Sequence, residues 1–164
     1  MKKLLLTLML VMPMSVFAQK FGHFNLTEVA AAMPEYAAAQ ADMESKSKVY
    51  QDELQRMQDE FQTKLEDYQK NAETLPDAVK ERRESELRDL QQRIEEYVNK
   101  SRQELSQLES QKMQEIQEKL LKAVKAVGQN GGYVYIFDVA SLPYVSDTLS
   151  KDVTADVKAQ LGIK

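Results

Sequence analysis

Few side chains in this sequence have the type and spacing needed for chemistry. The chain has 164 residues with no cysteine and one histidine, which excludes thiol catalysis, disulfide bonds and metal sites built from cysteine or clustered histidine. His23 has no nucleophile motif beside it, so it is expected to be a packed or surface residue. Asp138, at the end of a predicted strand, is expected to cap the following turn. With no glycine-rich phosphate loop either, we expect no catalytic residue, no cofactor, no metal site and no enzymatic activity.

The overall charge argues against a nucleic-acid partner. The formal net charge is -4 although 29% of the residues are charged, whereas nucleic-acid-binding proteins usually carry a basic surplus. Aromatic residues make up only 7% of the chain, so a large compact core is not expected.

Residues 1–18 have the features of a cleaved signal peptide. Lys2 and Lys3 precede an apolar run, and Val16-Phe17-Ala18 fits the small-residue rule for cleavage after Ala18. The apolar run is too short to span a bilayer comfortably, which disfavours the alternative of an N-terminal membrane anchor. The sequence therefore predicts an exported, soluble product, and cleavage would change the net charge from -4 to -6 by removing two lysines.

The middle of the sequence predicts two long helices. No glycine occurs between Gly22 and Gly128, and from Tyr50 apolar residues recur at steps of three and four within residues 34–73. An apolar stripe resumes at Val79 and runs through Met113 to Val127. Pro76 interrupts this pattern, which predicts a turn near residues 74–77. Helices of roughly 60 Å and 75 Å joined by a short turn must pack antiparallel. We therefore expect a coiled-coil hairpin over residues 44–127, with Gly128 as the C-cap of its second helix.

The two ends of the chain predict a small β-containing body, made of residues 19–43 and 128–164. Strands are expected at 21–26 and 133–139, a short helix capped by Thr27, and a closing helix over 152–161. Because the strands come from opposite ends of the sequence, the hairpin would be an insertion between paired strands. So small a body has a marginal core and exposed strand edges, which favours self-association. The candidate interface residues are Phe21, Phe24, Leu26, Tyr133, Tyr135, Phe137 and Val145.

Several segments resemble one known family. Residues 20–26, Met33-Pro34-Glu35-Tyr36, Tyr135-Ile136-Phe137-Asp138 and the tail 144–157 are similar to the Skp (OmpH-like) family of periplasmic chaperones. The resemblance implies a mainly α fold in which three hairpins extend from a small trimeric β-barrel-like body. It further implies a homotrimer in the periplasm of a Gram-negative bacterium that encloses unfolded outer-membrane proteins without using ATP. Familiar members of this family are basic, whereas this chain is acidic, so transient association with membranes or lipopolysaccharide has no support in the sequence.

Adaptable apolar residues on the helices are the candidate client contacts. Met and Tyr suit varied partners, but the same residues at heptad spacing also suit packing between the two helices, and the sequence leaves both interpretations open. A second functional hypothesis is a structural coiled-coil spacer or envelope tether that binds no client. The candidate client contacts are Tyr50, Met57, Phe61, Tyr68 and Tyr97.

Overall fold

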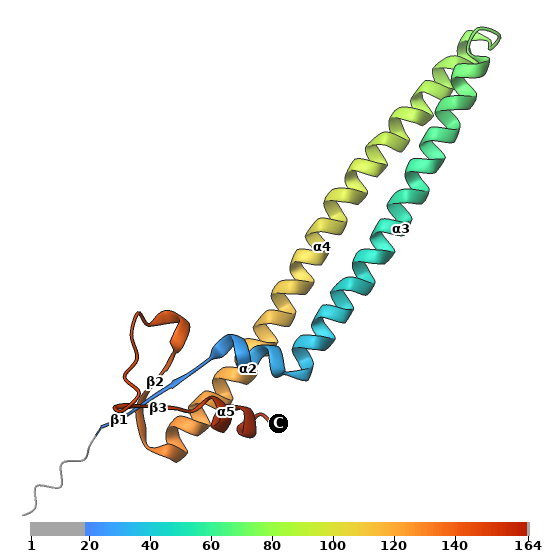
Figure 1. Ribbon diagram of the computed structural model, residues 1–164. Coiled ribbons are helices and arrows are strands. Elements are labelled where there is room, and N and C mark those ends of the chain that lie inside the picture. Colours follow the sequence, from blue (N-terminus) through green and yellow to red (C-terminus); the bar gives the residue numbers. More distant parts are fainter. Residues whose placement is uncertain (1–18, 164) are drawn as a thin grey trace, which may run out of the picture.

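A computed structural model describes residues 19–163, so the predicted signal peptide lies outside the described residues. Figure 1 shows two long helices that extend side by side from a small body made of both ends of the chain. None of the helices within residues 19–163 is long and apolar enough to cross a membrane. The elements in chain order are β1 (Lys20–Phe24), α2 (Leu26–Ala32), α3 (Pro34–Asn71), α4 (Asp77–Gly131), β2 (Tyr133–Asp138), the 3₁₀ turn η2 (Val139–Ser141), β3 (Ser150–Asp152) and α5 (Thr154–Gln160).

The predicted antiparallel hairpin is confirmed by α3 and α4. Pro34 occupies the first turn of α3, and Pro76 is the extended residue before α4, with φ -60° and ψ 147°, so each proline stands where a missing N–H costs nothing. Helix α3 ends at Asn71, slightly earlier than predicted, because Thr74 donates both its N–H and its hydroxyl to the Asn71 carbonyl. Leu90 is 1% exposed and lies on the face of α4 that packs against α3.

Two predicted helix caps were wrong. Helix α4 continues through Gly128 to Gly131, and its C-cap is Gly132, whose φ of 66° is left-handed and whose N–H donates to the Gly128 carbonyl. Among the glycines at this end of the helix, Gly132 is the one with the backbone conformation that glycine adopts without strain. At the start of α2 the cap is Asn25 rather than Thr27, since the Asn25 side chain accepts a hydrogen bond from the Glu28 N–H at 3.0 Å.

The sheet has three strands in the order β2-β1-β3, and both outer strands run parallel to β1. Strand β1 precedes the hairpin and β2 follows it, so the prediction of an insertion between paired strands is confirmed. In this register Phe21 lies opposite Tyr135, and His23 lies between Phe137 and Asp152. Strand β3 was not predicted, because its sequence, Ser-Lys-Asp, has no apolar residue. Within the described chain the sheet is open, and its closure into a barrel stays a prediction.

The core is built where the base of α4 meets α2, α5 and β1. Val153 and Val157 are fully buried, as the predicted apolar face of the last helix requires. That helix begins at Thr154 rather than Asp152, because Asp152 belongs to β3 and its carboxylate accepts hydrogen bonds from the Thr154 N–H and hydroxyl at 2.8 and 2.6 Å. The buried members of the cluster are Phe24, Val29, Met33, Ala39, Ile116, Leu120, Ala123, Val127, Val153 and Val157. The hairpin is thereby anchored in the body through the first turns of α3 and the last turns of α4.

Candidate functional site

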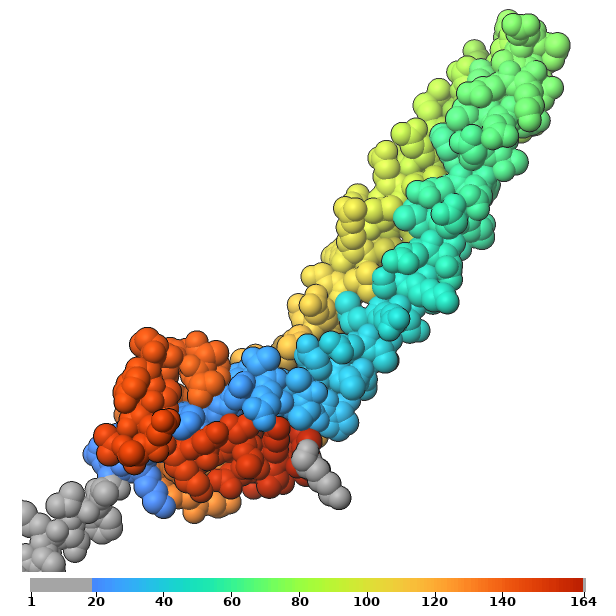
Figure 2. All heavy atoms as spheres, in the orientation of Figure 1, coloured from blue at the N-terminus to red at the C-terminus, as the bar shows by residue number. Residues whose placement is uncertain are grey.

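The hairpin is the dominant surface of the molecule, and Figure 2 shows it as a narrow arm that stands clear of the body. All five predicted client contacts lie on it and all five are half-buried. In the lower half of the hairpin, Tyr50 of α3 and Tyr97 of α4 pack edge to face, with their ring centroids 6.2 Å apart. The Tyr50 hydroxyl also donates to Glu104 at 2.5 Å, and this bond to a carboxylate raises the pKa of Tyr50.

A similar contact joins the helices nearer the tip. The Tyr68 hydroxyl donates to Glu84 at 2.6 Å, which raises the pKa of Tyr68, and Arg83 lies 3.8 Å from the Asp67 carboxylate. Tyr50 and Tyr68 thus have two roles open to them, because each residue is half-buried while its hydroxyl already donates a hydrogen bond across the hairpin. Contact with clients stays a prediction for these two residues and for Tyr97, Met57 and Phe61.

Ion pairs join the helices at the base of the hairpin. Lys112 lies 2.9 Å from Asp42, and Lys119 donates to Glu35. The hydrogen bond from Lys119 lowers the pKa of Glu35, and the hydrogen bond to Asp42 raises the pKa of Lys112. Both groups therefore remain charged near neutral pH, and the pairs join the two helices close to the body.

Three apolar residues on the hairpin are more exposed than the predicted contacts. Val49 is 61% exposed, Leu121 is 53% exposed and Met113 is 44% exposed. Val49 and Leu121 are not among the predicted contacts, and Met113 was predicted to lie on the apolar stripe of the second helix. The spacing contained the signal for Met113, because the step from Leu108 is five residues, which breaks the alternation of three and four. Lys112, at a step of four, occupies the half-buried position instead.

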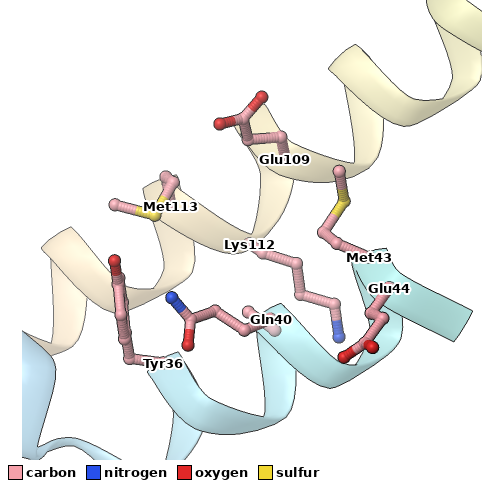
Figure 3. A pocket seen from close by; sticks show the side chains of 8 residues that line it. Tyr36, Gln40, Met43, Glu44, Glu109, Lys112 and Met113 are labelled. Carbon is pink, nitrogen blue, oxygen red and sulfur yellow. The ribbon is translucent and has the colours of Figure 1, made fainter. Parts of the chain in front are cut away.

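A groove lies between α3 and α4 at the base of the hairpin, and we call it the base groove. It encloses about 470 Å³. Its lining comes from Tyr36, Gln40, Met43 and Glu44 of α3 and from Glu109, Lys112 and Met113 of α4, which Figure 3 labels. The groove exists because the segment of α3 that begins Pro-Glu-Tyr-Ala-Ala-Ala places the small side chain of Ala39 opposite α4, so that the flanking longer side chains are not packed together.

The outer face of the sheet carries a row of aromatic rings. Phe21 stacks on Tyr135 at a centroid distance of 6.4 Å, and Tyr135 stacks on Phe137 at 5.7 Å. These rings are 36%, 58% and 42% exposed, respectively, so this aromatic row lies on the face opposite the helical core. Of the other predicted interface residues, Leu26 is exposed and Tyr133 and Val145 are half-buried, whereas Phe24 lies in the core of the chain itself.

The polar residues around the sheet have structural partners. His23 Nδ1 lies 2.8 Å from the Ser150 hydroxyl, but the neighbouring Asp152 carboxylate accepts its hydrogen bonds from Thr154. Asp138 accepts from the backbone N–H groups of Leu26 and Ala140, at 3.2 and 3.3 Å, which confirms its predicted role at the turn. Within residues 19–163, no group of three or more histidine, aspartate or glutamate side chains is placed to hold a metal ion.

Comparisons with known proteins agree with one another. The model of the outer membrane protein (OmpH-like) family matches residues 20–161. The chain is 27% identical over 147 residues to a protein of Yersinia enterocolitica named chaperone protein Skp, covering 90% of this chain and 88% of that protein. A solved structure of an OmpH-like protein from Caulobacter crescentus superposes with a TM-score of 0.77 at 13% identity, covering 87% of this chain and 83% of that one. At that identity, the structural likeness shows the fold.

Proposed function

The chain belongs to the OmpH-like family, and on this premise we propose that it is an ATP-independent chaperone that holds unfolded outer-membrane proteins and prevents their aggregation. The observation that carries the proposal is the long hairpin standing clear of a small body. The Yersinia relative bears the name of a chaperone, and the predicted signal peptide directs this chain to the periplasm of a Gram-negative bacterium. We propose no catalysis, because holding a client by reversible contacts requires none.

The holding surface consists of scattered apolar side chains on a charged hairpin. Exposed Val49, Met113 and Leu121 are separated by polar positions, so no single patch is large enough to drive association between copies of the chaperone. Each contact is weak, and many weak contacts from several arms give useful avidity while allowing the client to exchange one contact for another. The half-buried tyrosines and methionines of the hairpin add to this surface where their rings and thioethers face solvent.

We propose a homotrimer assembled through the body. The aromatic row of Phe21, Tyr135 and Phe137 is apolar and uncovered, and each outer strand of the sheet has a free edge within the described chain. Exposed rings and unpaired strand edges both favour pairing with another copy. Three bodies joined in this way would close the open sheets into a barrel-like centre and place three hairpins around one cavity.

The experiment that tests the proposed function measures light scattering. A urea-unfolded outer-membrane β-barrel protein is diluted into buffer without ATP, with and without the mature protein at a slight trimer excess. We expect scattering to be suppressed, and an unrelated coiled coil of similar length provides the matched control. If scattering stays at the level of that control, the chaperone proposal is wrong and the structural spacer becomes the better hypothesis.

A further inference from the structure

The base groove combines an apolar interior with an acidic rim. Its apolar lining consists of the Tyr36 ring, the small Ala39 side chain and two methionines, Met43 and Met113, one from each helix (Figure 3). A volume of about 470 Å³ lies within the range of sites that enclose small ligands. Methionine adapts its shape and makes favourable sulfur contacts with aromatic rings, so this lining suits the insertion of one large aromatic side chain.

The charges around the groove do not balance. The single ammonium of Lys112 lies 2.9 Å from Asp42, so that its charge is already matched. The carboxylates of Glu44 and Glu109 also line the groove, and neither forms a salt bridge with any residue of the described chain. Two carboxylates without a salt-bridge partner in the described chain thus line the groove, while the charge of Lys112 is matched by Asp42, so the rim attracts a positive charge placed next to whatever fills the interior.

We propose that the base groove binds an aromatic side chain of an unfolded client that has a lysine or arginine next to it in sequence. This inference rests on the proposed chaperone function and assigns the chemical class of segment held at this place on the hairpin. The aromatic ring lies against Met43, Met113 and Tyr36, and the neighbouring cation pairs with Glu44 or Glu109. The rest of the client remains free to exchange contacts along the arm.

The chain has no tryptophan, so the fluorescence of a tryptophan-containing peptide reports its binding without background. The probes are flexible Gly/Ser decapeptides with a central Trp flanked either by two Lys or by two Glu residues. At low salt we expect the Lys-flanked peptide to bind about fivefold more tightly, as one or two exposed ion pairs allow. Equal affinities of the two peptides, or a dissociation constant above about 1 mM for the Lys-flanked peptide, would overturn the proposal.

Matched variants assign the binding to the groove. E44Q/E109Q should reduce the preference for the Lys-flanked peptide to less than about twofold. The control, E81Q/E95Q, makes the same change in net charge at exposed residues of α4 away from the groove, and it should keep the full preference. M113S should weaken both peptides by about threefold or more, while L149S, which truncates a residue that is 77% exposed on the segment before β3, should not. Met113 and Leu149 are both surface residues, and circular dichroism checks that each variant remains helical.

The outcomes separate this inference from the proposed function. If the parent protein suppresses aggregation but E44Q/E109Q and M113S bind both peptides as the parent does, the groove is not the site and only the inference fails. If the parent fails to suppress aggregation, the chaperone proposal itself is wrong, whatever the peptides do.

Discussion

Tyr50 and Tyr97 meet edge to face across the hairpin, with ring centroids 6.2 Å apart, and Tyr50 at the same time donates a hydrogen bond to Glu104. Two residues that sequence alone proposes as client contacts therefore also join α3 to α4. A substitution at either position changes helix pairing as well as the surface that a client meets. Binding experiments on these tyrosines need a stability measurement beside them.

Leu90 is the least exposed hairpin residue away from the body in the described chain, at 1%. Leu90→Ala should reduce the free energy of unfolding by about 2–4 kcal/mol, because it removes a buried side chain and leaves a cavity between two helices. Urea unfolding followed by circular dichroism measures the loss. Leu121→Ala is the control, since Leu121 is 53% exposed and should cost less than about 0.5 kcal/mol. Equal losses for the two variants would contradict the packing described here.

Asp152 should contribute a pH-dependent part of the stability. Hydrogen bonds from Thr154 lower the pKa of this carboxyl in the folded chain, so its contribution is fully present above the unfolded pKa of about 3.9. The contribution is lost as the pH falls through the lower folded pKa. Asp152→Asn should therefore be less stable than the parent at pH 7, and the difference should shrink below pH 3.9. Urea midpoints measured at both pH values test this, and a difference independent of pH would contradict it.

A shortened chain should still form the trimer if assembly belongs to the body. Deleting residues 50–104 and bridging with a glycine-rich turn keeps the Asp42–Lys112 ion pair and the buried base residues Ile116 and Leu120. Sedimentation should then give three subunits, as for the parent protein. A folded monomer would mean that the arms, and not the body, hold the assembly together.

The aromatic row should be needed for that assembly. Phe21→Ser combined with Tyr135→Ser removes two stacked, exposed rings and should raise the dissociation constant of the trimer by at least about tenfold. The control is Tyr144→Ser, at a residue that is 79% exposed on the segment before β3. Sedimentation over a dilution series distinguishes the two. Unchanged assembly in the double variant would exclude this face as the interface.

Single substitutions on the arm should change client affinity only modestly. Met57 is one half-buried residue among many predicted client contacts, so Met57→Ser should weaken the binding of an unfolded outer-membrane protein by less than about tenfold. Fluorescence quenching of a labelled client gives the affinity. A loss of a hundredfold or more, with the helices intact, would indicate one defined pocket instead of distributed contacts.

The sequence predicted the elements that have a periodic apolar pattern, and it did not predict the features that depend on single residues. Apolar periodicity and Pro76 were sufficient for the hairpin, because a long amphipathic pattern has few alternative structures. Strand β3 had no such pattern, since Ser150, Lys151 and Asp152 become a strand only by pairing with β1. The N-cap of α2 was predicted wrongly for a related reason. Asn25 and Thr27 are both good capping residues, and tertiary contacts select between them.

The candidate site was predicted less completely than the fold. Periodicity identifies which residues face the opposite helix, and Tyr50, Tyr68 and Tyr97 do contact it. It does not reveal where two helices leave space between them, because the base groove depends on the small size of Ala39 and on the break in spacing before Met113. Both features are visible in the sequence, but their effect depends on the register of the two helices, which is a property of the pair.

The sheet joins segments that are far apart along the chain, and this imposes an order on folding. The Asn25 N–H donates to the Thr154 hydroxyl across 129 positions of sequence, a separation that makes direct encounter of the free ends slow and entropically costly. The hairpin removes most of that cost, since pairing that spreads from the turn at residues 72–76 brings Pro34 and Gly131 to the same end. We therefore expect α3 and α4 to pair first and the body to fold last.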